Sequence, residues 1–459
     1  MTDHADLLGF PADFRWGAAT SAYQIEGAAA DGGRKPSIWD TFARTPGKVA
    51  GGETGDIAVE HYKRFPEDVA LMAELGLRAY RFSLSWARLQ PDGRGPANPE
   101  GVAFYRRLLE TLSEHGIEPV ATLYHWDLPQ ALEDNGGWLN RDTAYAFAEY
   151  AALAHECLGD LVQTWVTVNE PWCAAFLGYS SGVHAPGKQD PPGALRAAHH
   201  LLLAHGLANQ RIKAGPHPAR VGLAPNFYPV DPLTDSVADA GAAHLIDLLQ
   251  NRLFLEPVMK GYYADDIRKH VEQVCGTEHI RPGDEAIIGE PIEFVGVNYY
   301  SVYRVSAGTA TGEPTSWPGA EDVEFHRYGT RTTHIGWDVA PDGLLRTLER
   351  IGDEYPDLPI YITENGAAYD DVAGEDGRVD DFDRVEFLRD HFAAVHEALQ
   401  RGVDVRGYFL WSLLDNFEWA EGYRMRFGIV HVDYATQRRT RKASADYYAE
   451  VIRANGVRR

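Results

Sequence analysis

Eight short, strand-like apolar runs recur along this chain of 459 residues, and between them lie patterns with apolar residues three and four positions apart. The apolar runs predict strands at residues 14–18, 79–84, 119–124, 164–168, 221–224, 294–297, 360–363 and 405–410. The helical patterns cover residues 65–75, 101–115, 142–158, 193–214, 343–351 and 381–401. This alternation predicts an α/β fold, a single (β/α)8 TIM barrel over residues 1–459. A doubly wound sheet is the structural alternative.

Length alone would also suit two or three domains, but no Pro/Gly/Ser-rich linker divides the chain. The residues in excess of a minimal barrel fall in polar, Gly-rich stretches after strand ends, at 44–56, 178–192, 306–334 and 370–380. In a barrel, long loops at these positions would wall a deep pocket at the C-terminal face, where barrel enzymes keep their chemistry.

The composition restricts the partners. A formal net charge of −24 disfavours nucleic acid and anionic membranes, because phosphate surfaces are bound through clustered Lys and Arg. A neutral or cationic small substrate fits better. Several of the 11 Trp residues stand beside polar motif residues, and aromatic faces pack against the C–H surfaces of sugars, although aromatic residues are also ordinary core material.

Cys157, Cys173 and Cys275 have no metal-ligand spacing, and their odd number argues against a disulfide framework. The first ten residues lack a basic segment followed by an apolar stretch, and no apolar run is long enough to span a membrane. We therefore expect a soluble cytoplasmic protein. The chemistry considered below requires no metal and no cofactor.

Two tracts, 167–171 and 362–366, each place one glutamate, Glu170 or Glu364, at the end of a strand-like run. Most glutamates in a chain with 67 acidic residues only solvate a surface. These two, however, follow buried strands and precede Pro171 or the pair Asn365 and Gly366, which end the strands. Two facing carboxyls are the catalytic groups that most enzymes use to cleave a glycosidic bond.

Other polar and aromatic side chains fall at the same ends of the predicted strands, where barrel topology would make them neighbours. They include Gln24, Arg81, His125, Asn298, Tyr300 and Trp411. A single such residue is usually structural, but their accumulation is most simply explained by a polyhydroxyl ligand that needs many donors and acceptors.

The tracts at residues 14–27, 123–129, 167–171, 362–366, 411–419 and 426–433 resemble those of glycoside hydrolase family 1, the β-glucosidase family. The resemblance covers essentially the whole chain. It implies a retaining hydrolase of β-linked sugars on a (β/α)8 barrel, with Glu364 as the nucleophile and Glu170 as general acid and then base. In such an enzyme the carboxyls lie only about 5–5.5 Å apart, since one attacks the anomeric carbon directly.

The resemblance also implies roles for the neighbouring residues. Arg81 and Tyr300 would favour the charged form of Glu364, and Asn169 would bind the sugar 2-hydroxyl. Residues that match those around the non-reducing sugar are Gln24, His125, Trp411, Glu418 and Trp419, with Asn298 supporting the pocket. The carboxyl of Glu418 would repel a phosphate, which argues against 6-phosphorylated sugars. The presence of Glu170 indicates ordinary O-glycosides, because the thioglucosidase branch lacks this acid.

Trp126, Trp337 and Phe427 are candidates for further aromatic walls, with Trp337 placed in the leaving-group subsite; for each, a role in core packing is equally open. The sequence thus favours a β-glucosidase that releases terminal glucose, with tolerance for galactose or fucose, and whose partners are small β-glycosides and cello-oligosaccharides. Two alternatives remain, a transglycosidase on the same site and a catalytically silent carbohydrate-binding protein. The second has no need for two costly facing carboxylates.

Overall fold

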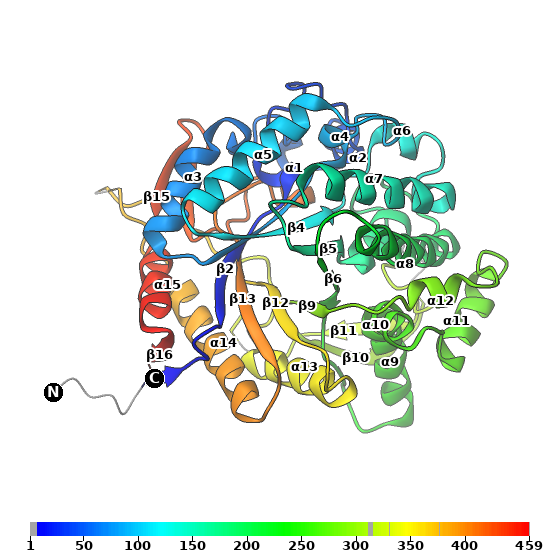
Figure 1. Ribbon diagram of the computed structural model, residues 1–459. Helices are drawn as coiled ribbons and strands as arrows, with labels where there is room; N and C mark the ends of the chain where they lie inside the picture. Colours follow the sequence, from blue (N-terminus) through cyan, green and yellow to red (C-terminus); the bar gives the residue numbers. More distant parts are fainter. Residues whose placement is uncertain (1–6, 311–314, 330, 376, 459) are drawn as a thin grey trace.

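In the computed structural model, which describes residues 7–310, 315–329, 331–375 and 377–458, eight parallel strands close into a barrel (Figure 1). Around the ring they are β2 (Arg15–Ala19), β3 (Ala79–Ser83), β4 (Glu118–Tyr124), β5 (Thr164–Asn169), β6 (Arg220–Ala224), β9 (Phe294–Tyr299), β12 (Ile360–Asn365) and β13 (Val405–Trp411). The pairing of β13 with β2 closes the ring. All eight predicted strands are confirmed to within two residues, and the doubly wound alternative is wrong.

Apolar side chains fill the interior of the barrel. One buried cluster takes a residue from every strand, namely Ala19, Ala79, Val120, Val166, Ala224, Phe294, Tyr361 and Phe409. The same cluster continues into Tyr300, Trp411 and Phe427. The strands are apolar on both faces because their outer faces pack against helices, as in other parallel sheets. The packed interior therefore forms a rigid floor beneath the aromatic residues at the ends of the strands.

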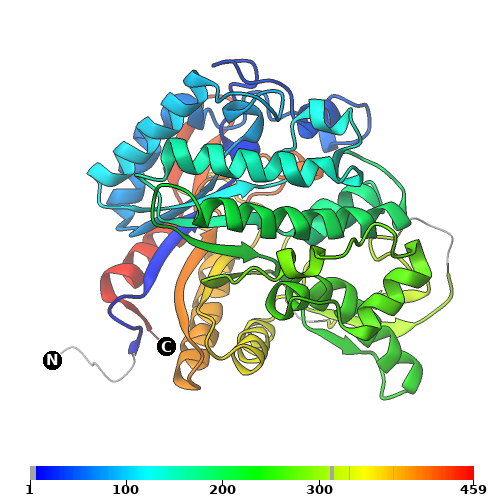
Figure 2. The ribbon, with the colours of Figure 1, turned by 45° about the vertical axis from the view of Figure 1, so that its right-hand side comes forward.

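Helices surround the strands (Figure 1). The six predicted helices are confirmed as α3 (His61–Leu75), α5 (Pro99–Glu114), α7 (Asp142–Leu158), α8 (Pro191–Lys213), α13 (Pro341–Glu354) and α14 (Phe382–Gln400). At the start of α8, the Asp190 side chain accepts a hydrogen bond from the backbone N–H of Gly193 at 3.0 Å, and prolines occupy the first helical positions. Figure 2 shows α7 and α8 lying side by side across the barrel.

Nine α-helices of the described residues were not predicted from the sequence. Four are short helices in the first third of the chain: α1 (Ala22–Ile25), α2 (Ile38–Ala43), α4 (Trp86–Leu89) and α6 (Gln130–Glu133). Four others lie between β6 and β9 and one near the C-terminus: α9 (Val237–Asp247), α10 (Leu253–Lys260), α11 (Asp265–Cys275), α12 (Asp284–Ile288) and α15 (Ala443–Ala454). A π-helical turn at Leu248–Arg252 joins α9 to α10, and Pro257 lies inside α10. An inserted π turn shifts the helical phase, so the hydrophobic spacing does not continue from α9 into α10.

Short strands form small sheets outside the barrel. A small sheet consists of β8 (Val230–Pro232), β10 (Tyr303–Ala307) and β11 (Val323–His326), and the last of these lies inside the predicted loop 306–334. Parts of the predicted loops, residues 311–314, 330 and 376, lie outside the described residues, as do residues 1–6. Near the two chain ends, β1 (Leu7–Gly9) pairs with β16 (Gly456–Arg458) (Figure 1).

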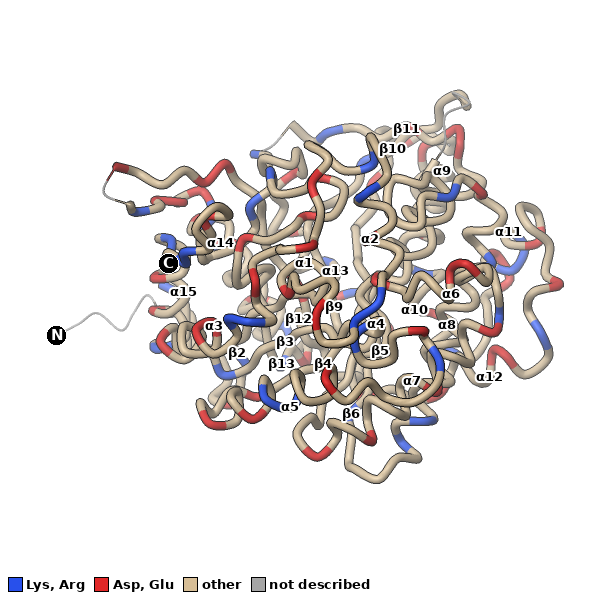
Figure 3. The backbone as a smooth tube through the Cα atoms, turned by 90° about the horizontal axis from the view of Figure 1, so that it is seen from above, with Lys and Arg blue, Asp and Glu red and all other residues tan. Residues whose placement is uncertain are grey.

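Acidic and basic residues are intermixed along the surface segments when the molecule is viewed from above (Figure 3). Among the described residues, no helix combines the length and the apolarity that crossing a bilayer requires.

Candidate active site

The two glutamates lie at the C-terminal ends of β5 and β12, as predicted. Glu364 is within β12, where the register places it beside Asn298 of β9. Glu170 directly follows β5, and its backbone N–H donates to Ala224 O of β6 at 2.8 Å. The side chain of Asn298 also reaches Glu170, with Nδ2 2.7 Å from Oε1. Asn298 therefore neighbours both carboxyls.

A continuous chain of hydrogen bonds joins the two acids. Arg81 Nη1 donates to Glu364 Oε1 at 2.7 Å, and Arg81 Nη2 donates to Asn169 Oδ1 at 2.5 Å. Asn298 Nδ2 donates to the same Asn169 oxygen at 3.0 Å and to Glu170 Oε1. The structure thus brings together five of the residues that the sequence singled out, from strands that are far apart along the chain.

The guanidinium group of Arg81 determines which group donates in each of these hydrogen bonds. Arg81 can only donate, so the Asn169 atom facing it must be the amide oxygen. Asn298 must then present its NH2 group to that oxygen and to Glu170. The other end of the Asn169 amide is the NH2 group, which lies 3.1 Å from His125 Nε2. His125 must accept this bond and is therefore a neutral imidazole with its proton on Nδ1.

The two carboxyls have different surroundings. Burial raises the pKa of Glu364 above its ordinary value, and the adjacent Arg81 guanidinium and the Tyr300 hydroxyl, which donates to Oε2 at 2.6 Å, offset only part of this rise. Burial and the charge of Glu364 raise the pKa of Glu170 to about 8, and no cation contacts this side chain directly. In a pair of coupled acids the proton resides on the member without the cation, which here is Glu170.

A cavity of about 310 Å³ opens over both acids. Ten of the predicted site residues line it: His125, Trp126, Glu170, Tyr300, Trp337, Glu364, Trp411, Glu418, Trp419 and Phe427. The other four, Gln24, Arg81, Asn169 and Asn298, are buried and hydrogen-bonded to lining residues or their neighbours. The candidate aromatic walls are thus at the cavity, with Trp126 4.6 Å from the Trp419 ring and Trp337 5.3 Å from Tyr300.

The cavity also has lining residues that the sequence did not single out, among them Trp172, Cys173, His184, Asn226, Tyr228, Tyr303 and Trp317. Trp172 and Trp317 pack at 5.2 Å, and Tyr228 stacks on Tyr303 at 4.4 Å. Cys173 lies three residues after Glu170, a helical spacing that could have indicated proximity. Trp317 lies in a long loop, and no spacing rule connects it with the site.

Three lining residues adopt a left-handed backbone conformation: Trp126 (φ 76°), Glu170 (φ 44°) and Trp419 (φ 50°). For residues other than glycine, such conformations cost on the order of 1–3 kcal/mol each and persist only where the surrounding structure holds them. Their concentration around one cavity is typical of functional sites.

The comparisons with known proteins agree with this geometry. The family model "Glycosyl hydrolase family 1" matches residues 8–457. The chain belongs to glycosyl hydrolase family 1. It is 50% identical to the thermostable beta-glucosidase B of Thermobispora bispora, over 100% of this chain and 93% of that one. It is 45% identical to a bifunctional beta-D-glucosidase/beta-D-fucosidase of Bifidobacterium breve, over 98% and 99% of the two chains. A solved family 1 β-glucosidase from Thermotoga maritima superposes with a TM-score of 0.94 at 43% identity, covering 99% of this chain and 100% of the other.

Family 1 consists of retaining β-glycosidases, so the protein is a retaining β-glycoside hydrolase, as the sequence predicted. The similar proteins are named β-glucosidases, which makes that activity the one supported here and disfavours a silent binding protein or a dedicated transglycosidase.

Glu418 has an unexpected charge state in this family 1 site. Burial raises its pKa to about 8, with further contributions from the nearby carboxyls of Glu364 and Glu170. Gln24 Nε2 donates to Glu418 Oε2 at 3.3 Å, and this bond only partly offsets the burial. In the free site at neutral pH, Glu418 therefore carries a proton, so a charge-assisted contact with sugar hydroxyls requires that this proton be lost.

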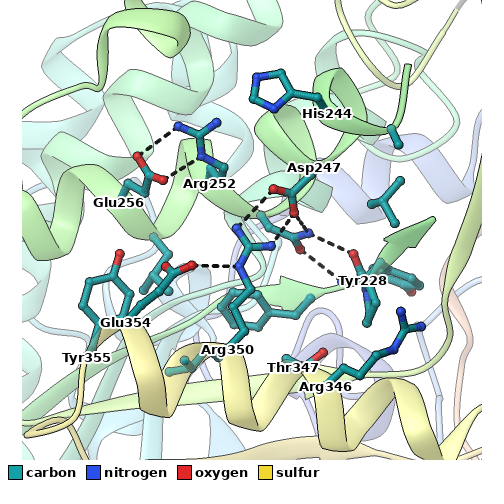
Figure 4. Close-up of a pocket in the computed structure, with 17 residues that line it drawn as sticks. Tyr228, His244, Asp247, Arg252, Glu256, Arg346, Thr347, Arg350, Glu354 and Tyr355 are labelled. Carbon is teal, nitrogen blue, oxygen red and sulfur yellow. Dashed lines mark hydrogen bonds and ion pairs between the residues drawn. The ribbon is translucent and has the colours of Figure 1, made fainter. Parts of the chain in front are cut away.

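A second pocket, of about 370 Å³, lies between α13 and the α9–α10 segment (Figure 4). Its charged side chains neutralise one another: Arg350 pairs with Asp247 at 2.6 Å and with Glu354 at 3.0 Å, and Arg252 pairs with Glu256 at 2.7 Å. Neither Glu170 nor Glu364 lines it, so this pocket is not the catalytic centre that the family 1 motifs indicate. Nor do the described residues contain a group of three His, Cys, Asp or Glu side chains placed to hold a metal ion.

Proposed function

We propose that this enzyme is a β-glucosidase in which Glu364 is the nucleophile and Glu170 is first the general acid and then the general base. The observation that carries the assignment is the asymmetry of the linked pair: Arg81 donates to Glu364 at 2.7 Å, whereas among the described residues Glu170 accepts only from Asn298 and Cys173. A cation favours the ionised form that a nucleophile needs, and its absence favours the protonated form that an acid needs.

In the first step, Glu364 attacks the anomeric carbon while Glu170 gives its proton to the departing glycosidic oxygen. The bond from the anomeric carbon to that oxygen breaks and a covalent glycosyl-enzyme forms. Capture of the sugar removes the negative charge of Glu364, which is one of the causes of the high pKa of Glu170. Glu170 is then a carboxylate of lower pKa, suited to take a proton from the incoming water in the second step.

We further propose that terminal glucose binds among His125, Trp411, Glu418 and Trp419, whereas Trp337 lies at the leaving-group side. Asn169 would bind the sugar 2-hydroxyl, a contact that strengthens in the transition state. The buried amide of Asn169 is already engaged by Arg81, Asn298 and His125, so its orientation is fixed before the sugar arrives. Substrates would be aryl β-glucosides and cello-oligosaccharides, with fucosides accepted as the name of the Bifidobacterium relative suggests.

The remaining parts of this proposal concern the whole chain. We place all of it in one catalytic domain, since the last barrel strand pairs with the first. A cytoplasmic location is consistent with three unpaired cysteines, Cys157, Cys173 and Cys275, which suit a reducing compartment. Cell fractionation with an antibody against the protein tests this location.

Initial rates on a panel of aryl β-glycosides and cello-oligosaccharides test the substrate assignment. Glu364→Gln should lose nearly all activity, and unchanged turnover would refute the nucleophile assignment. Azide should partly rescue Glu364→Gly and give a glycosyl azide of inverted configuration, because azide then attacks from the face that Glu364 normally occupies.

A further inference from the structure

Cys173 is in direct contact with Glu170 and has no assigned role. It is the first residue of the π-helical turn Cys173–Leu177, which follows β5, and its Sγ lies 3.0 Å from Glu170 Oε2. The side chain is buried, with 7% of its surface exposed, and it lines the catalytic cavity. Burial and the neighbouring Glu170 raise the pKa of the thiol well above its usual range, so it stays protonated and donates to Oε2.

The two oxygens of Glu170 have partners of different kinds. Oε1 faces the NH2 group of Asn298, whose direction is fixed through Asn169 by the Arg81 guanidinium. An amide NH2 can only donate, so Oε1 cannot point a proton towards it. Oε2 faces a thiol, which is both a weak donor and a weak acceptor. Oε2 is therefore the oxygen that can carry the catalytic proton without losing its partner.

We propose that Cys173 is a positioning residue for Glu170: its thiol donates to Oε2 when Glu170 is a carboxylate, turns to accept when Oε2 is protonated, and so holds the side chain in both half-reactions. This inference rests on the proposed acid/base role of Glu170. The proton moves between Oε2 and the glycosidic oxygen or water, and the thiol keeps its own hydrogen throughout.

Asn226 supports the thiol from its other side. Its Nδ2 lies 3.7 Å from Cys173 Sγ, and the side chain is buried with 3% of its surface exposed. A donor directed at the sulfur leaves the S–H hydrogen free to point at Glu170. The thiol is thus held between one amide and the carboxyl.

Other groups also act on the charge of Glu170 and would be unchanged by a substitution at Cys173. From the surrounding elements these are Glu364 of β12, Arg81 of β3, Glu418 after β13 and the phenols Tyr228, Tyr300 and Tyr303. A change confined to Cys173 variants is therefore attributable to the thiol.

The test compares Cys173→Ala, Cys173→Ser and a matched control, Cys275→Ala, at the end of α11. Loss of a donor to the carboxylate disfavours ionisation, so the basic limb of kcat/KM against pH should move to higher pH in Cys173→Ala, by about half a pH unit for a weak hydrogen bond. Cys173→Ser, with a stronger donor to the carboxylate, should move the limb to lower pH than in the parent. Cys275→Ala should match the parent. A basic limb that stays in place in both Cys173 variants would overturn the proposal. If the alanine variant does not fold, the position of the basic limb in the serine variant alone decides.

Substrates with different leaving groups distinguish the positioning of Glu170 by Cys173 from a general loss of activity. At the optimum pH, Cys173→Ala should lower kcat/KM about 3- to 10-fold on cellobiose, whose departing oxygen needs a proton, and less than about twofold on 2,4-dinitrophenyl β-glucoside, whose leaving group does not. In the Glu170→Gln variant, adding Cys173→Ala should not change kcat/KM for 2,4-dinitrophenyl β-glucoside any further. An additional decrease of kcat/KM in the double variant would overturn the proposal. If Glu170→Gln itself keeps the parent rate on cellobiose, the proposed role of Glu170 fails instead, and the two failures are distinguishable.

Discussion

The hydroxyl of Tyr300 offers a direct measure of how the site favours the ionised form of Glu364, the proposed nucleophile. It donates to Glu364 Oε2 at 2.6 Å, and the tyrosine is buried at the top of the barrel interior. Tyr300→Phe deletes this one donor and leaves the ring that packs against Trp337 and Phe427. The change should therefore alter the charge equilibrium of Glu364 with little change in packing.

The size of the effect follows from the bond that is removed. A hydrogen bond to a charged group contributes about 1.5–3 kcal/mol, and one pKa unit corresponds to 1.36 kcal/mol, so the pKa of Glu364 should rise by about 1–2 units. The hydroxyl favours the carboxylate, so its loss makes ionisation harder. The acidic limb of kcat/KM should consequently move to higher pH, while the basic limb, governed by Glu170, moves much less. The bell-shaped profile should narrow.

The assay is kcat/KM for an aryl β-glucoside between pH 4 and pH 10, because this quantity reports the ionisation of the free enzyme. Tyr299→Phe is a matched control: the Tyr299 hydroxyl also makes a 2.6 Å hydrogen bond, but to the backbone oxygen of Ala340. Its acidic limb should stay in place even if the protein is less stable. An acidic limb that does not move in Tyr300→Phe, or that moves equally in Tyr299→Phe, would refute the reasoning.

Three further outcomes are expected. Because Glu418 has a pKa of about 8, Glu418→Gln should weaken glucose inhibition little at pH 6 and about tenfold at pH 9, where the parent is ionised; an equal ratio at both pH values would contradict this. Gly366→Ala should lower the free energy of unfolding, measured by urea denaturation, by at least about 1–3 kcal/mol, because the added Cβ would lie 1.6 Å from Trp411 O. Gly241→Ala in α9 is the control and should not destabilise the protein, because its added Cβ would have no atom within 4 Å. Trp317→Ala should raise KM for aryl glucosides about 2- to 10-fold and leave the Ki of glucose unchanged, because Trp317 packs against Trp172 beside the cavity.

The parts of the fold that could be predicted from the sequence are those where one periodicity runs uninterrupted. The strands are buried on both faces, so their apolar runs are continuous, and α13 carries a regular apolar stripe. In the segment between β6 and β9, the apolar residues do not follow one uninterrupted periodicity. There, the π turn Leu248–Arg252 interrupts the helical phase, and no spacing of apolar residues predicts α9 and α10 as one continuous path.

Barrel topology alone predicts only the site residues that end a strand, whereas Gln24, Glu418 and Trp419 were named because of the family resemblance. The positions of Glu170 and Glu364 follow from barrel topology, because all strands of a parallel barrel end at the same face. Trp317 reaches the cavity from the loop between β10 and β11, and its place depends on how that loop folds back. The charge state of Glu418 was also beyond sequence reasoning, since it depends on burial and on two carboxyls contributed by other strands.

Arg81 links the fold to the chemistry of the site. Its alternation along β3 directs it into the barrel, where it donates to Glu364, to Asn169 and to Thr122 Oγ1 at 3.1 Å. Because a guanidinium group only donates, this one residue both favours the carboxylate of Glu364 and orients, through Asn169, the Asn298 amide that donates to Glu170 Oε1. The same direction of bonds leaves Oε2 as the oxygen for the proton. The difference between the two acids therefore depends on a single buried cation that hydrogen-bonds to Glu364 and acts on Glu170 only from a greater distance.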